Sequence, residues 1–351
     1  MVLAGLLDLL SIHYPIIQAP MAGGVSTPLL AAEVSEAGGL GMIGAGYLNP
    51  NETRKQIREV KSRTIKPFGV NLFIPEKTFW AEGETRKAYD ALEAFRFKLG
   101  VESSYSTSSA DHYKEQLEII IEEGAPICTF TFGLPSDEEI QLLKEKNIVL
   151  IATATTVEEA KLAERKGMDA VVVQGSEAGG HRGTFLHTME EGLVGLISLV
   201  PQAADRVNIP LIAAGGIMDS RGINAVLCLG AQAAQLGTAF LTCKESGANP
   251  VHKKAVLSAT EEQTVVTKVF SGKYARGIYN NFIKEMEEAD AAVAPFPIQN
   301  SFTGGIRKEA ARQNNPGYMS LWSGQSPRLS RDVSAFELMQ SLVAGLNCNN
   351  E

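Results

Sequence analysis

Cysteine is scarce in this chain, and no two cysteines have the spacing of a metal or redox motif. The four cysteines are Cys128, Cys228, Cys243 and Cys348, and none occurs in a C-x-x-C pattern. Because Cys128 and Cys228 lie in apolar runs, we expect buried packing thiols in a reducing cytoplasm. A disulfide framework or a zinc site of cysteines is not expected.

Positive charge is also sparse. The 351 residues include 32 Lys and Arg against 40 Asp and Glu, which gives a formal net charge of -8 and no basic stripe. This balance argues against nucleic acid as a partner. The first basic residue is Arg54, so the sequence indicates no targeting segment. No apolar run is long enough to cross a bilayer without charge, proline or clustered glycine, so we expect a cytoplasmic protein without a membrane partner.

What the chain does contain is a regular alternation of apolar strand-like runs and helical segments. The expected strands are residues 16–21, 40–46, 67–74, 126–132, 148–154, 170–173, 209–214 and 233–236. Several of the helices between them begin at Ser or Thr and end at glycine. Eight parallel strands in this order predict an α/β fold of the (β/α)8 TIM-barrel type, with a doubly wound sheet as the alternative.

Two segments do not follow the alternation. Residues 75–115, after the third strand, are polar and aromatic, and a connection of this length predicts a lid-like insertion. Residues 244–351 are largely helical by pattern, so we expect a C-terminal helical cap that packs over the barrel mouth. The chain is therefore divided into a barrel at 1–243 and a cap at 244–351.

The most informative segment follows the sixth strand. It reads Gln174-Gly175-Ser176-Glu177-Ala178-Gly179-Gly180-His181-Arg182-Gly183. In α/β folds, reactive groups lie just past the carboxyl ends of strands. Glycine lets the backbone approach a ligand closely, and His181 can exchange a proton near neutral pH. The alternative is an ordinary turn that happens to contain a histidine.

Glycine pairs after the last two strands suggest an anion site. Gly215-Gly216 follows the seventh strand and Gly237-Thr238 follows the eighth, which are the usual positions of a phosphate site in this fold. Tight strand-to-helix turns would also favour glycine. The stretch Gly39–Gly44 matches G-x-G-x-x-G, but it follows a helix and enters a strand, so we interpret it as a helix end and close packing inside the barrel.

Three amide side chains lie within apolar strands. Asn71, Gln174 and Gln235 can each donate and accept hydrogen bonds, as a flavin's polar edge or ribityl hydroxyls require. We favour ligand contact for Asn71 and Gln174, and leave Gln235 open between ligand and core. His13, His112 and His252 have no acidic or cysteine partner at ligand spacing, so no metal site is predicted.

Six ordered segments of the chain carry a family resemblance. They are 18–24 (Gln-Ala-Pro-Met-Ala-Gly-Gly), 69–71 (Gly-Val-Asn), 175–183, 214–217 (Ala-Gly-Gly-Ile), 235–238 (Gln-Leu-Gly-Thr) and 321–325 (Leu-Trp-Ser-Gly-Gln). With them the chain resembles, over nearly its whole length, the nitronate monooxygenase family, formerly called 2-nitropropane dioxygenases. Members are FMN enzymes built on a TIM barrel.

The resemblance implies a set of site residues. The equivalent of His181 is the base, or the group that binds substrate, beside the flavin. Through the resemblance and the glycine pairs we assign FMN contacts to Met21, Asn71, Gln174, Gly179, Gly180, Gly215, Gly216, Gln235, Leu236, Gly237, Thr238, Trp322, Ser323, Gly324 and Gln325. The last four are expected to close over the flavin.

One position departs from the family pattern. Members of the best-studied class often have a second histidine in the fourth strand, in a pattern like Phe-His-Phe-Gly, where this chain has Thr131. Thr131 can form hydrogen bonds but carries no positive charge, so weaker binding of an anionic nitronate, or a different substrate, is expected. We assign substrate contacts to Thr131 and His181.

The expected activity is oxidation of an alkyl nitronate, such as propionate 3-nitronate, with O2. The nitronate would give one electron to FMN, and the products would be a carbonyl compound with nitrite or nitrate. Two alternatives stay open: an FMN-dependent reductase that uses NADH or NADPH on a quinone or an enoyl-acyl carrier protein, and a flavin-binding protein without catalysis. The sequence leaves open whether the chain is a monomer or a dimer.

Overall fold

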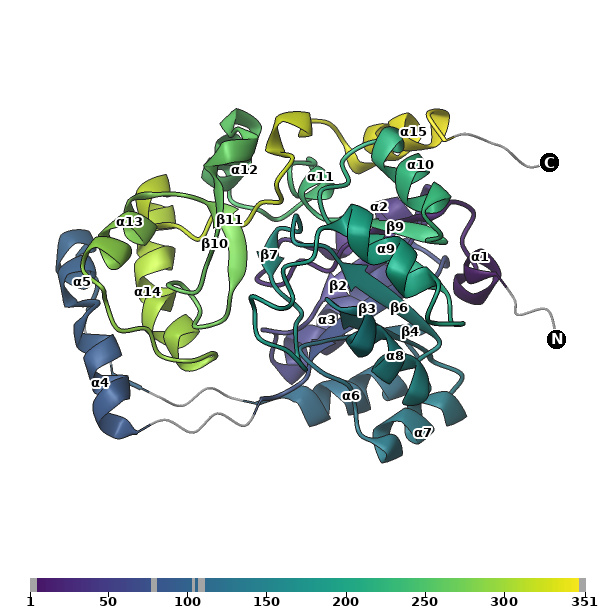
Figure 1. The fold of residues 1–351 in the computed structure, drawn as a ribbon, viewed down its shortest axis with the longest axis horizontal. Coiled ribbons are helices and arrows are strands. Elements are labelled where there is room, and N and C mark those ends of the chain that lie inside the picture. The colour runs from purple at the N-terminus through teal and green to yellow at the C-terminus, as the bar shows by residue number, and fades with distance from the viewer. Residues whose placement is uncertain (1–4, 77–80, 103–104, 107–110, 347–351) are drawn as a thin grey trace.

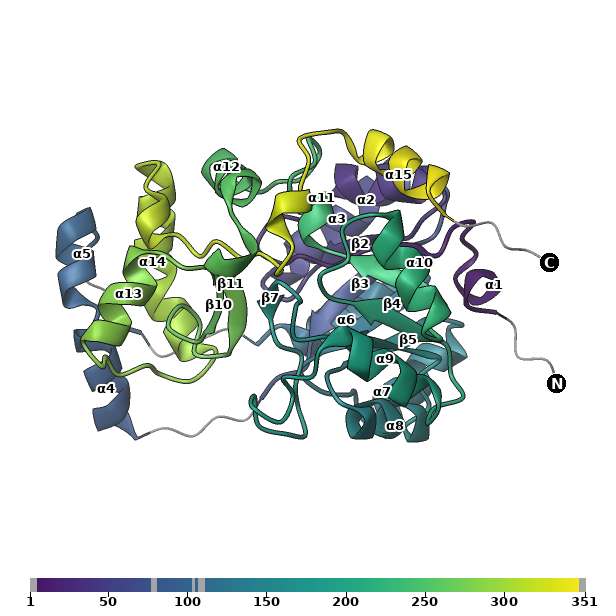
Figure 2. The ribbon, with the colours of Figure 1, turned by 45° about the horizontal axis from the view of Figure 1, so that its top comes forward.

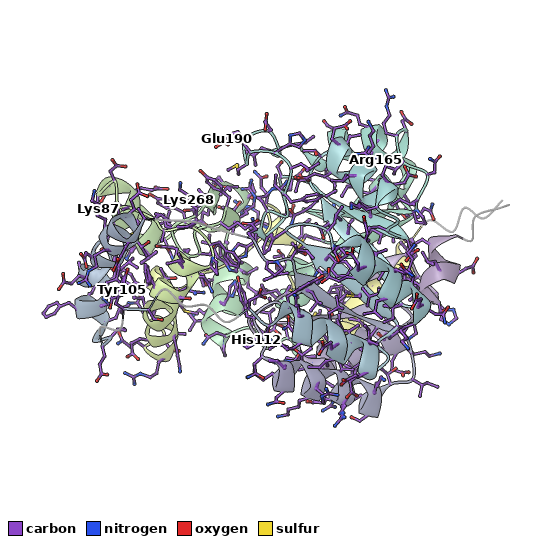
Figure 3. The ribbon with its side chains drawn as sticks, turned by 90° about the horizontal axis from the view of Figure 1, so that it is seen from below. Lys87, Tyr105, His112, Arg165, Glu190 and Lys268 are labelled. Carbon is purple, nitrogen blue, oxygen red and sulfur yellow. The ribbon has the colours of Figure 1, made fainter. Side chains whose placement is uncertain are left out.

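The molecule has two parts, a barrel and a smaller lobe beside it. The structure is a computed structural model that describes residues 5–76, 81–102, 105–106 and 111–346. Figure 1 shows the barrel with its surrounding helices at the right and the smaller lobe at the left. Seen from below, Lys87 and Tyr105 lie on the smaller lobe, whereas His112 and Arg165 lie on the barrel (Figure 3).

Eight parallel strands form the barrel, as the sequence predicts. They are β1 (Ile16–Gln18), β2 (Gly41–Gly44), β3 (Phe68–Phe73), β4 (Ile127–Thr131), β5 (Val149–Ala154), β6 (Ala170–Gln174), β8 (Leu211–Ala214) and β9 (Ala233–Leu236). Their order in the sheet is β1-β9-β8-β6-β5-β4-β3-β2. The sheet closes at Leu40, whose N–H donates to Ile16 O over 3.0 Å and whose carbonyl accepts from Gln18 N–H over 2.9 Å. The TIM-barrel prediction is therefore confirmed.

Helices surround this barrel. They are α1 (Leu6–Leu10), α2 (Pro28–Glu36), α3 (Pro50–Arg63), α6 (Tyr113–Glu122), α7 (Asp137–Glu145), α8 (Val157–Arg165), α9 (Leu196–Ala204), α10 (Ser220–Cys228), α11 (Thr238–Leu241) and α15 (Ala335–Ala344). Side-chain caps position several of their first turns. Thr27 accepts from Leu30 N–H at the start of α2, and Asn49 with Glu52 forms a capping box at α3.

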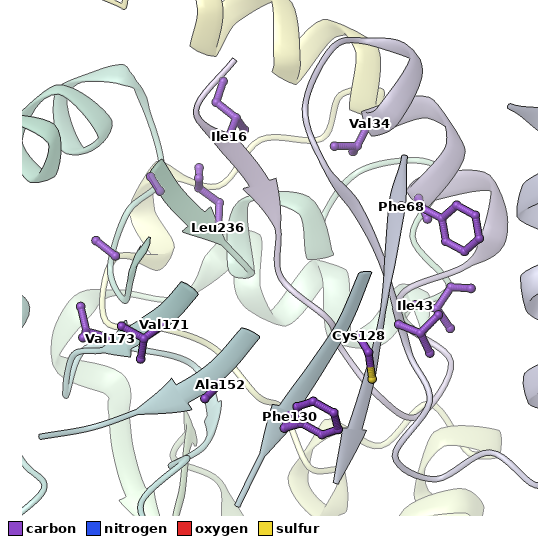
Figure 4. Close-up of a cluster of buried hydrophobic side chains, with 14 of the residues drawn as sticks. Ile16, Val34, Ile43, Phe68, Cys128, Phe130, Ala152, Val171, Val173 and Leu236 are labelled. Atoms are coloured by element: carbon purple, nitrogen blue, oxygen red, sulfur yellow. The ribbon is translucent and has the colours of Figure 1, made fainter. Parts of the chain in front are cut away.

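Two apolar layers stabilise the barrel. Successive side chains of a strand point to opposite faces, so each strand supplies both layers. The outer layer packs the strands against the helices and includes Ile16 and Phe130 together with Val34 of α2 (Figure 4). The inner layer fills the barrel and includes Ile17 of β1 and Leu6 of α1. The interior of the barrel is thus a packed core.

The smaller lobe is built from two segments that are far apart in the chain. Its elements, with the neighbouring α12, are α4 (Glu82–Asp90), α5 (Glu93–Leu99), β10 (Thr264–Thr267), β11 (Ala275–Ile278), α13 (Asn281–Glu288), α14 (Ile298–Arg312) and α12 (Pro250–Ser258). Short 3-10 helices lie at Glu261–Gln263, Pro316–Tyr318 and Pro327–Leu329. A separate apolar cluster holds this lobe together, with Phe95 of α5, Phe282 of α13 and Ile306 of α14 among its members.

The C-terminal region is less purely helical than the sequence analysis expected. β10 and β11 form an antiparallel hairpin, which was not predicted. β11 also pairs with the two-residue strand β7 (Gly180–His181), and Figure 2 shows β7 where the barrel meets the smaller lobe. The hairpin is hard to predict because β11 reads Ala-Arg-Gly-Ile, which is not an apolar run, and because no short Asn-Gly or Asp-Gly turn joins the two strands.

The expected insertion and cap contact each other and the barrel. Residues 75–115 contribute α4 and α5, which pack on α14, although 77–80, 103–104 and 107–110 lie outside the described residues. After the smaller lobe the chain returns to the barrel, where α15 packs against α2 and α10. The division at residue 243 and the lid and cap roles stay predictions.

The cysteines and one glycine stretch can now be placed. Cys128 and Cys243 are buried, as expected, but the expectation for Cys228 is wrong: it ends α10 and is exposed. Cys348 lies outside the described residues. In the described part of the chain, no helix combines the length and apolar character needed to cross a membrane.

The glycines of the G-x-G-x-x-G stretch serve packing. A Cβ on Gly41 would overlap the backbone of Ala31 in α2, and one on Gly44 would lie 2.7 Å from Ala22 N. Close packing was expected inside the barrel, whereas Gly41 packs outward against α2. The protein's own backbone therefore occupies the space beside these glycines.

Gly41→Ala should destabilise the barrel, because the added methyl group would overlap Ala31. We expect the free energy of unfolding to fall by about 1–3 kcal/mol, as in overpacked cores, measured by urea unfolding. The matched control is Gly304→Ala within α14, where an added Cβ meets no atom within 4 Å. That control should be neutral or gain up to about 1 kcal/mol from helix propensity. Equal stability of Gly41→Ala and the wild type would contradict the packing argument.

Candidate active site

A cavity opens at the carboxyl ends of the barrel strands. It contains about 1320 Å³ of empty space, part of it open to solvent, and every barrel strand or the turn after it contributes to its wall. His252 of α12 and Trp322 complete the wall. TIM barrels place their ligand sites at this end.

Most of the site residues expected from the sequence meet in this cavity. Those in its wall are Met21, Asn71, Thr131, Gln174, Gly179, Gly180, His181, Gly215, Gly216, Gln235, Gly237, Thr238, Trp322 and Gly324. Three are not in the wall: Leu236 is in the outer apolar layer, Ser323 is buried, and Gln325 is exposed. The ligand roles of all these residues stay predictions.

The side chain of Gln174 forms two hydrogen bonds with the loop that contains His181. Its Nε2 donates to His181 O over 3.0 Å, and its Oε1 accepts from Gly183 N–H over 2.9 Å. The loop is thereby tied to the end of β6 at two points on either side of Arg182. Part of the hydrogen-bonding capacity of Gln174 is therefore used within the protein.

The amides of Asn71 and Gln235 differ in their partners. Asn71 Nδ2 donates to Thr129 Oγ1 over 2.9 Å and to Thr131 Oγ1 over 3.1 Å, while its carbonyl oxygen accepts from no described residue. The side chain of Gln235 has no hydrogen-bond partner within the described ranges, although it lies in the cavity wall. These two groups leave an acceptor and a whole amide for a ligand.

His181 is part of a sheet as well as of a loop. Its backbone pairs with Ala275 of β11, and Gly180 pairs with Arg276. The neighbouring Arg182 N–H donates to Tyr274 O over 2.8 Å. The hairpin of the smaller lobe therefore sets the position of a histidine that follows a barrel strand.

Two buried charged side chains support the same loop from the barrel side. Arg182 is 2% exposed, and its guanidinium donates to the carbonyl oxygens of Gly175 and Gly192. Glu159 is fully buried, and its Oε1 accepts from Phe185 N–H over 2.7 Å. Buried charges are retained when hydrogen bonds satisfy them. Glu159 meets this condition, whereas the Nε–H of Arg182 has no acceptor among the described residues.

Aromatic rings surround the imidazole of His181. The ring centroids of Trp322, Phe132 and Phe296 lie 5.4, 6.0 and 6.1 Å from the imidazole centroid. The imidazole also has one polar partner, Ser271 Oγ, at 2.8 Å from Nε2. An apolar wall of this kind disfavours a charged ring.

The pKa of His181 follows from these surroundings. Desolvation in the cavity wall lowers this pKa to about 3, and the positive charges of Lys273 and Arg307 add to the lowering. No described carboxylate contacts the ring to offset them. His181 is therefore neutral at ordinary pH and can accept a proton, whereas it cannot attract an anion by its own charge.

Backbone donors gather where the sequence suggested an anion site. Gly215 and Gly216 have φ of 134° and 67°, which glycine adopts readily. The N–H groups of Gly216, Gly237 and Thr238 donate to no acceptor in the described part of the chain, and all three residues lie in the cavity wall. Unpaired donors of this kind suit an anionic ligand group.

The glycine-rich loop also meets the late Trp-Ser-Gly-Gln segment directly. A Cβ on Gly179 would overlap the backbone of Gly324, and Gln325 N–H donates to Glu177 O over 2.9 Å. Thr238 Oγ1 accepts from Gly324 N–H over 2.9 Å. Segments from the middle and the end of the chain are thus joined beside the cavity.

Some residues of the site were missed by sequence reasoning. His252, judged to be an isolated histidine, is buried in the cavity wall, and its Nε2 donates to Trp322 O over 2.9 Å. Gln18 is buried and ties the turn after β1 through Ser26 Oγ at 2.8 Å. The signal for Gln18 was a polar residue in an apolar strand, the same signal that identified Asn71. No local pattern marks His252 or Ser271, because folding brings them to the site from distant segments.

The described residues contain no group of three His, Cys, Asp or Glu side chains that could hold a metal ion. The polar groups of the cavity are instead amides, hydroxyls, backbone N–H groups and two imidazoles. This donor set suits an organic ligand with an anionic group.

Comparisons with known proteins cover nearly the whole chain. The family model described as nitronate monooxygenase matches residues 5–345. A protein named "probable nitronate monooxygenase" from Staphylococcus haemolyticus is 48% identical over 337 residues, which cover 95% of this chain and 94% of that protein. A protein of the same name from Staphylococcus saprophyticus is 46% identical over 342 residues, with 97% and 96% covered.

Solved structures show the same similarity in three dimensions. Nitroalkane oxidase from Streptomyces ansochromogenes superposes with a TM-score of 0.92 at 40% identity, and 97% of each chain is covered. FabK from Thermotoga maritima superposes with a TM-score of 0.77 at 32% identity, covering 97% of this chain and 94% of that one.

The imidazole of His181 should stay neutral between pH 5 and 8. The reason is its lowered pKa, which puts protonation near pH 3. The measurement is the Cε1–H chemical shift in an NMR titration, assigned by comparison with His181→Asn. Free histidine in the same buffer serves as the reference and titrates near pH 6.5. A His181 signal that titrates with the reference would show that the ring is solvated.

Proposed function

The chain belongs to the nitronate monooxygenase family, and from this we propose that it binds FMN and uses O2 to oxidise nitronates and their parent nitroalkanes. The proposed products are a carbonyl compound and nitrogen in the form of nitrite or nitrate. Alkyl nitronates such as propionate 3-nitronate are the proposed substrate class. The observation that carries the proposal is a neutral His181 in a cavity whose wall leaves three backbone N–H groups, the side-chain oxygen of Asn71 and the amide of Gln235 without described partners.

The residues present fit FMN. The N–H groups of Gly216, Gly237 and Thr238 have no described acceptor, and such groups suit a phosphate. The free acceptor of Asn71 and the amide of Gln235 suit a polar ring edge or hydroxyl groups. Among the described residues we identify one such cradle at the cavity, and protein backbone occupies the space beside Gly41 and Gly44 of the G-x-G-x-x-G stretch, so FMN is favoured over a dinucleotide.

The cofactor, when bound, supplies the electron acceptor for the oxidation. The chain's own residues manage the proton and the position of the substrate. Neutral His181 can take the α-proton of a nitroalkane, whereas a preformed nitronate needs no proton removed. The rings of Phe132, Phe296 and Trp322 lie around the imidazole, and such apolar surroundings favour its neutral form.

Attraction of an anionic substrate falls to groups other than His181. Lys273 and Arg307 are the positive charges that act on the imidazole. Lys273 forms an ion pair with Glu76, and its Nζ lies 4.5 Å from the ring centroid of Phe132. Thr131 in the cavity wall adds a hydroxyl but no charge. We therefore infer that Lys273 and Arg307, rather than His181, would attract an anionic substrate.

A reductase that consumes reduced nicotinamide is the alternative that the similarity to FabK keeps in view. Both functions would use the same cavity and cofactor. Anaerobic mixing with NADH or NADPH separates them. Rapid loss of the oxidised-flavin absorbance would favour the reductase, and unchanged absorbance with aerobic turnover of propionate 3-nitronate would favour the monooxygenase.

One prediction from the proposed function concerns the cofactor. Protein purified after flavin supplementation should release FMN on heating, because the cavity offers a single phosphate cradle. Chromatography against FMN and FAD standards makes the measurement. Recovery of FAD, or of no flavin, would contradict the assignment.

Another prediction from the proposed function concerns His181 as the base. His181→Asn should lower kcat/KM on a neutral nitroalkane by about 10²–10⁴-fold, the usual cost of losing a general base, with much smaller loss on the preformed nitronate. Steady-state oxygen consumption with nitroethane and with ethylnitronate makes the comparison, and His187→Asn is the control because His187 lies outside the cavity wall. Equal and small losses on both substrates would rule out a base role for His181.

A further inference from the structure

The partner of the His181 imidazole lies in the turn of the β10–β11 hairpin. Ser271 is 1% exposed, and its Oγ is 2.8 Å from His181 Nε2. Ser271 is absent from the cavity wall although His181 belongs to it. This hydrogen bond therefore holds the ring through a residue outside the cavity wall, and it uses Nε2.

The direction of the bond follows from the number of hydrogens on Ser271. A hydroxyl has one hydrogen and two acceptor positions. Ser271 Oγ donates that hydrogen to Lys273 O at 2.9 Å, and a carbonyl can only accept. Lys273 N–H donates back to Oγ over 3.3 Å. When the hydroxyl hydrogen points to Lys273 O, the bond to His181 is donated by Nε2–H; the reverse arrangement would deprive Lys273 O of this donor.

We propose that Ser271 is a positioning residue that fixes His181 as the Nε2–H tautomer, so that Nδ1 is the atom that accepts the substrate's proton. Nδ1 has no hydrogen-bond partner within the described ranges. The proposal rests on the proposed function, in which His181 acts as the base. The proposal adds which nitrogen of the imidazole accepts the proton and which side chain determines the tautomer.

A hydroxyl is a particular choice of orienting group. A carboxylate in this position would fix the same tautomer but would also favour the charged imidazolium, as in the Ser-His-Asp triad. Ser271 orients the ring without adding negative charge. The charged groups that act on the ring from other elements are Lys273 of the turn and Arg307 of α14, and both oppose protonation.

The same hairpin holds the backbone and the ring together. β11 pairs with His181 through Ala275, and the turn that precedes β11 provides Ser271. The backbone pairing fixes where the residue lies, and the imidazole cannot rotate without losing its hydrogen bond to Ser271. A general base must be held within hydrogen-bond reach of the proton it removes, and this hairpin supplies that constraint.

The test reads the tautomer directly. Holoenzyme labelled with 15N-histidine should show a protonated Nε2 and an unprotonated Nδ1 for His181 at pH 7.5. Ser271→Ala should shift both nitrogen signals toward the average of two tautomers. It should also lower kcat/KM on nitroethane by roughly 10–100-fold, less than full loss of the base at about 10²–10⁴-fold. Turnover of ethylnitronate should be little changed.

Two further variants separate positioning from simple destabilisation. Thr267→Ala removes another buried hydroxyl of the same hairpin, one that accepts from Val269 N–H over 3.4 Å and does not touch His181. It should leave the nitrogen signals and both activities unchanged. Ser271→Thr keeps the hydroxyl, so this variant should have the wild-type tautomer and the wild-type rate on nitroethane.

Several outcomes would overturn the inference. A protonated Nδ1 in the wild type would do so at once. Unchanged nitrogen signals in Ser271→Ala, or equal losses on nitroethane and ethylnitronate, would assign Ser271 a structural role only. Failure of the wild type to turn over either compound would instead overturn the proposed function, while the nitrogen signals would still decide the tautomer.

Discussion

The pairing of β7 with β11 is the contact on which the site depends. Gly180 and His181 follow a barrel strand, yet their backbone pairs with a hairpin of the smaller lobe, and the His181 carbonyl also accepts from Gln174 of β6. Backbone pairing of this kind satisfies groups that would otherwise be buried without partners. It also means that neither part alone determines where the imidazole lies. The cavity, the aromatic wall and the serine contact all follow from this junction.

Desolvation then gives the histidine its chemical character. Its neighbours are rings, a hydroxyl and two positive charges, and no described acid offsets them. Burial among the rings and the two positive charges favour the neutral imidazole. The barrel end contributes unpaired donors on the other side, at Gly216 and Gly237. One cavity thereby offers a proton acceptor beside a place for negative charge.

The sequence predicted the barrel well because barrel strands are local apolar runs with clear ends. It also predicted much of the cavity wall, since strand ends of a parallel barrel converge on one face. It could not reveal the β10–β11 hairpin, because β11 is not an apolar run, or Ser271 and His252, which reach the site only through tertiary packing. The exposure of Cys228 was missed for a related reason: an apolar run does not show which side of a helix faces solvent. Leu236, Ser323 and Gln325 were named from a motif, which does not distinguish wall residues from their neighbours.

The distance in sequence between the cavity's walls has a consequence for how the protein matures. Ala19 and Gly324 line the same space, and α15 near the end of the chain packs against α2 near its start. Contacts between such remote segments form late, because the loop between them must close first. During synthesis the barrel strands emerge well before the segment that contains Trp322. The binding site is thus complete only when almost the whole chain has left the ribosome, so cofactor uptake would mark the last stage of folding.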